Sequence, residues 1–249
     1  MAHQAASYDL RYRSVPPYEV LSTRWLSYGD VIRLKQMEEM VEVHYNSGQF
    51  SYTLELLEKE FSHPSSMFLA LAEYYEKEGL FGFSHSRLAR YEIFYKFLKE
   101  KLEHEAEAQA EAKLSGFRDA LMYDLYLREN VKSRPSFAND QSTAKRQVRE
   151  FFEAEEANPT WLLGYEGFDS RQMSKMAHLE KLEDGSYVLF DYKNRDPLSK
   201  NAHAVRFQYE ERGVYGKKGI EECQERESDA DPEATGSGVW HRLPLLSGS

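Results

Sequence analysis

The stretch that decides the fold comprises residues 16–50, with the sequence PPYEVLSTRWLSYGDVIRLKQMEEMVEVHYNSGQF. Pro16 and Pro17 restrict their own φ angles and favour extended geometry in the residue before each of them. Ser27, three residues before Asp30, predicts a helix start of the capping-box type, in which the carboxylate also interacts favourably with the helix dipole. The Asn-Ser-Gly at residues 46–48 predicts the helix end, because glycine adopts the left-handed conformation at low cost. One long helix is expected between these two signals.

The apolar side chains of this helix are spaced so that they share one face. Leu34, Met37, Val41 and His44 recur at intervals of three and four residues. That spacing is typical of an amphipathic helix that packs its apolar side against a core. The periodicity therefore favours a core-facing helix.

The same stretch carries a resemblance to a known family. The matching segments are PPYEVL (16–21), WLSY (25–28), LK (34–35), EEMVE (38–42) and YNSGQF (45–50). They closely resemble a segment of bacterial proteins that combine a cobalamin-binding domain, a radical S-adenosylmethionine barrel and a C-terminal domain of unknown function. In those proteins the segment follows the last strands of the barrel, and a weaker similarity continues here to about Tyr192. The resemblance covers most of this chain but only the C-terminal part of the family.

The resemblance implies cofactors for the full-length family that this chain lacks the ligands to hold. A four-iron cluster, S-adenosylmethionine and cobalamin are implied, and the family's cluster is held by a Cys-x-x-x-Cys-x-x-Cys motif. This chain has one cysteine, Cys223, and one cysteine cannot supply three thiolates. We therefore expect a separated or truncated C-terminal piece with no catalytic, cofactor-binding or metal-binding residues of its own. Its expected partner is the radical S-adenosylmethionine barrel, or a second copy of the chain.

Composition limits the other function classes. The net charge is -10, and no basic cluster of five or more residues occurs, which argues against nucleic-acid binding. No run of eighteen apolar residues indicates a membrane span, and the N-terminal residues lack the apolar core of a signal peptide. A single cysteine fits a reducing compartment, so a cytoplasmic location is the expectation.

The first part of the chain predicts further helices after residue 50. A second helix carries Phe50, Leu54, Leu57 and Phe61 on one face, and a third is capped by Ser65 or Ser66 and ends at Gly79. A longer helix from about Arg87 continues into the Ala- and Glu-rich extension at residues 104–113, and a further helix is capped by Ser115. Its expected end is at residues 133–135. Residues 1–135 are thus predicted to be helical.

The hydrophobic period changes in the second part of the chain. Residues 143–157 predict one charged amphipathic helix. Alternation begins near Ala177, and Asp184-Gly185 is a hairpin signal before a strand at residues 187–192. Residues 202–209 could add a third strand. The predicted fold is mainly α, a helical bundle followed at residues 136–220 by a small α+β region with a β-hairpin. Residues 221–249 are predicted to be a disordered acidic tail, and the place of VWHRLPLL (239–246) within the fold stays open.

Six residues are candidates for a substrate pocket or a docking surface: Tyr18, Trp25, His44, Tyr45, Asn46 and Asp191. A histidine at a helix end could exchange a proton with a substrate, but its spacing favours a position at the edge of the core. Tyr18 and Trp25 could cover the open end of a barrel or could hold the helix entry as a hydrophobic staple. Asp191 could contact a substrate, although a turn-forming aspartate is favoured.

No catalytic motif separates these alternatives. The sequence contains no Gly-x-Gly-x-x-Gly, no Walker loop and no Gly-x-Ser-x-Gly elbow, and neighbouring carboxylates such as Glu155 and Glu156 diverge on a helix. The function that the resemblance implies is an accessory C-terminal domain of a cobalamin-dependent radical S-adenosylmethionine enzyme. Such a domain would close the barrel and shape the substrate pocket, and would not be catalytic alone. The alternative is a stand-alone helical protein-interaction module.

Overall fold

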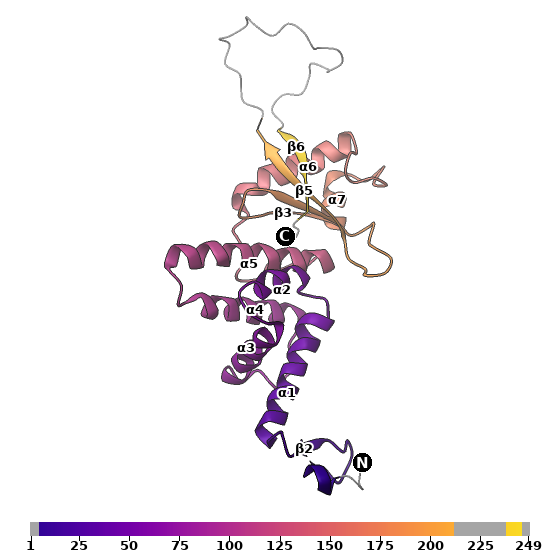
Figure 1. Cartoon of the computed structure of the whole chain (residues 1–249). Helices are drawn as coiled ribbons and strands as arrows, with labels where there is room; N and C mark the ends of the chain where they lie inside the picture. The colour runs from indigo at the N-terminus through magenta and orange to yellow at the C-terminus, as the bar shows by residue number, and fades with distance from the viewer. Residues whose placement is uncertain (1–4, 212–237, 246–249) are drawn as a thin grey trace, which may run out of the picture. The chain divides into compact units, whose positions relative to one another are not determined.

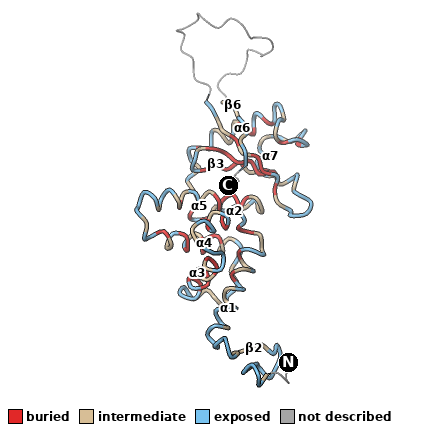
Figure 2. The backbone as a smooth tube through the Cα atoms, viewed as in Figure 1, coloured by how far each residue is buried: buried red, intermediate tan, exposed pale blue. Residues whose placement is uncertain are grey.

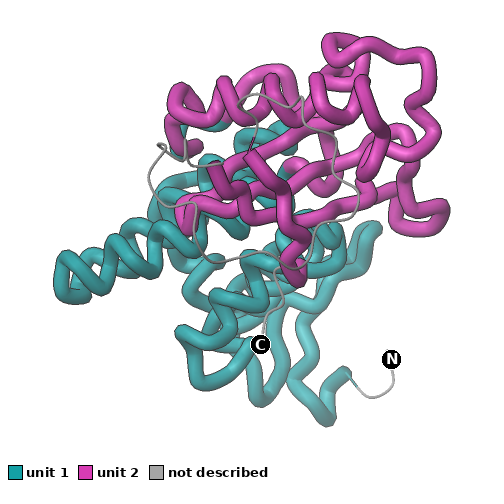
Figure 3. The backbone as a smooth tube through the Cα atoms, turned by 90° about the horizontal axis from the view of Figure 1, so that it is seen from above, with its two compact units in different colours: residues 1–125, 135–137, 248 teal, residues 126–134, 138–247, 249 magenta. Residues whose placement is uncertain are grey.

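The computed structural model describes residues 5–211 and 238–245 (Figure 1). These residues form two compact units, which Figure 3 shows in different colours. Unit 1 holds residues 5–125 and 135–137, and unit 2 holds residues 126–134, 138–211 and 238–245. The described residues form a helix-rich, mixed α/β structure. This is broadly compatible with the predicted helical bundle followed by an α+β region.

Unit 1 begins with a short hairpin and continues as helices. The elements are η2 (Ala6–Tyr8), β1 (Arg11–Tyr12), β2 (Val20–Ser22), α1 (Tyr28–Met40), the π-helical η3 (Val41–Asn46), α2 (Ser51–Glu58), α3 (Pro64–Lys77), α4 (Arg87–Leu102) and α5 (Glu107–Arg128). The last three residues of α5 belong to unit 2.

The start of α1 is the predicted capping box. The Ser27 hydroxyl accepts a hydrogen bond from the backbone N–H of Asp30, and the Asp30 carboxylate accepts one from the backbone N–H of Ser27, at 3.2 and 2.9 Å. Two N–H groups that the helix leaves unpaired are satisfied in this way. The extended geometry predicted around Pro16 and Pro17 is not what forms, because both prolines lie in the turn between β1 and β2, which is closed by a hydrogen bond from the Tyr18 N–H to the Val15 carbonyl.

The core of unit 1 gathers around aromatic side chains of η3, α3 and α4. His44 and Phe94 lie with ring centroids 5.0 Å apart, and Phe50 lies 4.6 Å from Tyr91. The phenol of Tyr91 donates to the Gln49 carbonyl at 2.9 Å. Of the face predicted for the second helix, Phe50, Leu54 and Leu57 are buried, whereas Phe61 is only partly buried and lies beyond the end of α2. On α3, Phe68, Leu71, Ala72 and Tyr75 are buried. Of the face predicted for α1, Leu34 is exposed, so the buried stripe starts only at Met40.

Several helix boundaries differ from the predictions, and α5 ends at Arg128 rather than at residues 133–135. His63 is the N-terminal cap residue of α3, and Pro64 occupies the first helical turn, where its missing N–H costs nothing. Ser66 instead donates its hydroxyl to the His63 carbonyl. The predicted continuous helix through the extension at residues 104–113 is broken at residues 103–106, and α5 passes through Ser115 without a break.

Unit 2 is an antiparallel sheet with two helices on one face. Its elements are η4 (Ser142–Ala144), α6 (Lys145–Ala157), α7 (Ser170–Met176), β3 (Ala177–Lys181), β4 (Tyr187–Asp191), β5 (His203–Glu210) and β6 (Val239–Leu243). The strand order is β3-β4-β5-β6, and Leu179 is aligned with Leu189.

One face of the sheet and the helices α6 and α7 share a core. Phe152 from α6, Met173 from α7 and Phe207 from β5 belong to it, and Trp240 of β6 packs against it. The predicted hairpin at Asp184-Gly185 is confirmed, with Gly185 at a φ of 83°. The predicted disordered tail is wrong at residues 239–243, because β6 pairs with β5 and aligns Trp240 with Tyr209. Residues 221–237 and 246–249 of the predicted tail lie outside the described residues, as does Cys223.

Candidate functional site

The N-terminal part of unit 1 exposes an unusual number of large apolar side chains. Fifteen such side chains are exposed in the described residues, and nine of them belong to the first 34 positions. We call these nine the N-terminal apolar surface: Tyr8, Tyr12, Val15, Tyr18, Trp25, Leu26, Tyr28, Ile32 and Leu34. Figure 2 shows the hairpin and the first turns of α1 largely as exposed chain, whereas α3 and α4 carry buried segments. A concentration of exposed apolar side chains is typical of a contact surface.

The two candidates Tyr18 and Trp25 both belong to this surface. Trp25 is 69% exposed, and Tyr18 is 61% exposed. Trp25 has one aromatic neighbour, Tyr8, whose ring centroid lies 5.7 Å away. Neither side chain is buried against the helix entry, as a staple would be. Their role in docking stays a prediction.

His44 is a core histidine. It is fully buried, its Nδ1 lies 3.1 Å from the Met40 carbonyl oxygen, and its Nε2 lies 3.5 Å from the Tyr75 hydroxyl. Burial lowers the pKa of His44 to about 4, because the charged imidazolium would be poorly solvated there. A neutral ring among aromatic side chains serves packing, and this is the arrangement that the periodicity favours.

The burial of His44 predicts a pH-dependent stability. Its folded pKa of about 4 lies below the unfolded value of 6.5, so the unfolded chain binds more protons between those pH values. Stability is therefore lost as the pH falls below about 6.5. We expect urea unfolding to show a loss of about 2 kcal/mol between pH 7.5 and pH 5 that is absent from His44→Phe. Equal losses in the two proteins would contradict a neutral buried imidazole.

Tyr45 and Asn46 do not join His44 in a polar cluster. Both are exposed, while His44 is buried. The Asn46 amide donates to Glu42 at 2.6 Å. Tyr45 lines an open cavity of about 750 Å³ in unit 1, together with apolar side chains such as Leu54 and Phe68. The three neighbours in sequence therefore face different surroundings, and no proton-transfer site is formed by them.

Asp191 lies at the end of β4 in unit 2 and holds the turn that follows. It is 3% exposed, and its Oδ1 accepts the backbone N–H of Lys193 at 2.9 Å. Oδ1 also accepts the Tyr165 hydroxyl at 2.5 Å, and Oδ2 accepts the side-chain amide of Asn194 at 2.7 Å. This is the geometry of a turn-forming aspartate. A contact with substrate stays a prediction.

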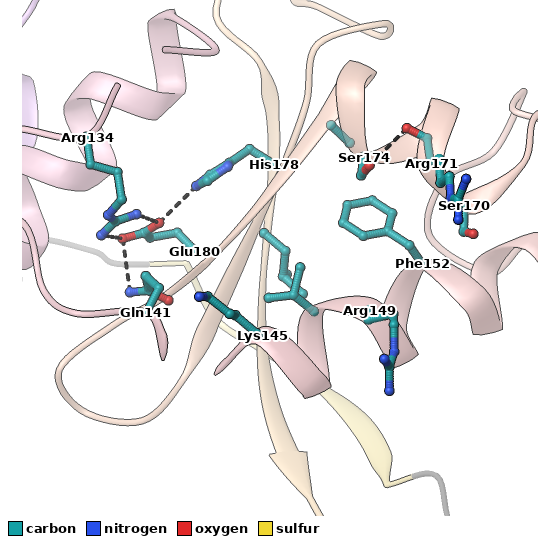
Figure 4. A pocket seen from close by; sticks show the side chains of 13 residues that line it. Arg134, Gln141, Lys145, Arg149, Phe152, Ser170, Arg171, Ser174, His178 and Glu180 are labelled. Carbon is teal, nitrogen blue, oxygen red and sulfur yellow. Dashed lines mark hydrogen bonds and ion pairs between the residues drawn. The ribbon is translucent and has the colours of Figure 1, made fainter. Parts of the chain in front are cut away.

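The candidate site that brings together the most charged and polar side chains is a cavity of about 450 Å³ in unit 2. The sequence did not indicate it. It lies along β3, which is the edge strand of the sheet, and is bounded by α6, α7 and the segment around Gln141. In Figure 4, Arg134, Gln141, His178 and Glu180 gather on one side, and Ser170, Arg171 and Ser174 lie on the other, next to Phe152. The floor is apolar and the rim is polar.

A buried carboxylate organises one side of this cavity. Glu180 is 2% exposed, and both of its oxygens accept hydrogen bonds from the Arg134 guanidinium, each at 2.7 Å. The Nε2 atom of His178 lies 2.9 Å from Oε2, and the Gln141 amide lies 3.3 Å from Oε1. Burial would raise the pKa of Glu180, but the hydrogen bonds and charges of His178 and Arg134 outweigh it and hold that pKa below its usual value.

These surroundings orient the His178 ring. Tyr126 stacks on it with a centroid separation of 3.7 Å and an interplanar angle of 19°. The ring is thus fixed by Glu180 at one nitrogen and by the phenol ring on one face. The sequence predicts only an alternating strand from about Ala177 and a helix end at residues 133–135, and neither pattern singles out His178, Glu180 or Arg134. Their association depends on contacts between positions 46 residues apart, so no local signal could have shown it.

Two further findings concern the described residues as a whole. No helix among them is both long and apolar enough to cross a membrane. No group of three or more histidine, cysteine, aspartate or glutamate side chains among them is arranged to hold a metal ion. The expectation that the chain binds no cofactor stays a prediction.

The fold and the cavity define a helix-rich, two-unit α/β protein with a small polar-rimmed pocket. Comparison with protein families gives a match to a protein family of unknown function, DUF4080, over residues 6–205. This match covers most of the chain, and the chain belongs to that family. Neither the curated proteins nor the solved structures contain a significant match.

Proposed function

We propose that this chain is an accessory domain that docks on a radical S-adenosylmethionine barrel and helps to shape its substrate pocket. One observation carries the proposal, which is the N-terminal apolar surface. The segment that resembles the barrel-following region of the cobalamin-binding radical S-adenosylmethionine proteins is the segment that exposes Tyr18, Trp25 and Tyr28. Exposed aromatic side chains that are concentrated in one region of a protein surface are typical of the centre of a protein–protein interface.

The chemistry of such an enzyme would belong to the barrel. A site-differentiated four-iron cluster needs three thiolates, and this chain contains a single cysteine. The residues present therefore do not fit the cluster. The role left to this chain is to contact the barrel and to exclude water from its open end.

The proposal is tested by measuring binding to a separately produced cobalamin-binding radical S-adenosylmethionine barrel by titration calorimetry. We expect Trp25→Ala to weaken binding by roughly tenfold or more, because buried interface tryptophans commonly contribute that much. Its melting temperature should change little, since the side chain is exposed in this chain. Phe83→Ala is the matched control, because Phe83 is 73% exposed but belongs to the segment between α3 and α4 and not to the N-terminal apolar surface.

Two outcomes would overturn the proposal. Unfolding of the Trp25→Ala variant would make Trp25 a core residue, and equal losses in Trp25→Ala and Phe83→Ala would remove the surface as the binding determinant. The second candidate function is a stand-alone interaction module. It is favoured if no barrel binds and if sedimentation shows self-association of the chain that Trp25→Ala abolishes.

A further inference from the structure

The cavity of unit 2 concentrates positive charge in an acidic protein. The whole chain carries 42 acidic and 32 basic residues. Around the cavity the balance is reversed, with Arg134, Lys145, Arg149 and Arg171 against the single carboxylate of Glu180. Local charge of one sign around a concave site raises the concentration of ligands of the opposite sign. The cavity is therefore electrostatically suited to anions.

The basic side chains differ in what they already bind. The Arg134 guanidinium is occupied by Glu180. Arg149 lies 3.7 Å from Glu153, and Figure 4 shows its side chain directed away from Phe152. The side chains of Lys145 and Arg171 form no hydrogen bond or ion pair within the described parts of the chain, although the charge of Lys145 helps to lower the pKa of the nearby Asp140. Lys145 and Arg171 can therefore each bind an anionic group of a ligand in the cavity.

The floor of the cavity selects for an apolar ligand body. Phe152, Ala177 and Leu179 line it and are at most 4% exposed. A volume of about 450 Å³ lies within the range of small-molecule sites, which combine apolar walls with a few polar groups. An inorganic ion would leave this floor uncovered, whereas a ring or a short hydrocarbon chain would cover it.

We propose that this cavity binds a small organic acid. Its apolar body lies against Phe152 and Leu179, and its carboxylate or phosphate group pairs with Lys145 or Arg171. The buried Glu180, its partly exposed partner Arg134 and His178 form a rigid wall, because each is held by two or more contacts. This binding requires no barrel, so it is independent of the docking function.

Titration calorimetry of the full chain tests the ligand class. Phenyl phosphate and benzoate are the probes, benzyl alcohol is the neutral control, and inorganic phosphate is the control without an apolar body. We expect at least one probe to bind roughly tenfold tighter than both controls, since a charge-assisted contact contributes about that factor. A preference between the two probes identifies the acid group. Equal binding of benzyl alcohol, or no binding of either probe, would overturn the proposal.

Variants locate the binding in the cavity. Arg171→Gln or Lys145→Gln should lower the affinity for the bound probe by about tenfold, whereas Lys175→Gln should leave the affinity unchanged. Lys175 is the matched control, since it lies in α7 with Arg171 and is exposed but does not line the cavity. Ser174→Phe places a ring at the cavity from an exposed position and should abolish binding without lowering the melting temperature. Probe affinity that is unchanged in all three cavity variants would refute the site.

Discussion

Replacing Arg134 with methionine is expected to lower the free energy of unfolding of unit 2 by about 3–5 kcal/mol. The Glu180 carboxylate is 2% exposed and accepts two hydrogen bonds of 2.7 Å from Arg134. Removing the guanidinium leaves a buried charge with only His178 and Gln141 beside it. Urea unfolding followed by tryptophan fluorescence measures the loss, since Trp161 and Trp240 lie in unit 2 and pack against its core.

Two further variants make this result specific. Arg149→Met makes the same change at an exposed pair, whose partner Glu153 lies 3.7 Å away, and should cost no more than about 1 kcal/mol. In the double variant Arg134→Met with Glu180→Met, part of the loss should be recovered, because no buried charge remains without its partner. A loss below 1 kcal/mol in Arg134→Met alone would show that Glu180 is stabilised mainly by its other neighbours.

Sequence patterns predict the structure correctly where residues close together in the sequence determine it. The capping box at Ser27 and Asp30 needs only residues three positions apart, and it forms as predicted. The hairpin at Asp184-Gly185 is likewise set by the turn residues themselves, since Gly185 adopts a positive φ. The burial of Leu54 and Leu57 on α2 follows from their spacing, whereas Phe61, the last residue of that predicted face, lies beyond the end of the helix and is only partly buried.

Long-range contacts explain the boundaries that the sequence did not show. Ala and Glu favour a helix throughout residues 103–112, yet α4 ends at Leu102. The break is held by Lys113, which contacts Glu105 at 2.8 Å and Glu60 at 2.6 Å. Asp124 similarly accepts the backbone N–H groups of Tyr52 and Thr53 at the start of α2. Contacts between positions 53 or more residues apart do not appear in the local hydrophobic periodicity from which helices are predicted.

The cavity of unit 2 also depends on contacts between residues that are distant in the sequence, and strand β3 is an example. Alternation along β3 suggests one buried and one exposed face, but Glu180 is buried on the face opposite Leu179. Period-two patterning assumes that polar residues face water. It fails where a buried carboxylate has a guanidinium partner from a distant segment, as Glu180 has in Arg134.

Glu155 offers the second large effect, because its carboxylate is buried, which the sequence pattern did not indicate. Glu155 is 3% exposed, and its Oε2 atom accepts the backbone N–H groups of Thr160, Trp161 and Leu162 at 3.1, 2.8 and 2.8 Å. These bonds hold the segment after α6, whose Leu162 is fully buried in the core of unit 2.

Glu155→Ala is therefore expected to destabilise unit 2 by about 3 kcal/mol, because three N–H groups lose a charged acceptor in a largely buried position. Hydrogen exchange at the amides of residues 160–162 should accelerate more than exchange in the strands, since the segment detaches before the sheet unfolds. Glu155→Gln keeps one acceptor oxygen and should lose less. Glu153→Ala makes the same truncation on α6 at an exposed side chain whose partner is Arg149, and should cost no more than about 1 kcal/mol. If Glu155→Ala and Glu153→Ala lower stability equally, the three hydrogen bonds do not hold the segment.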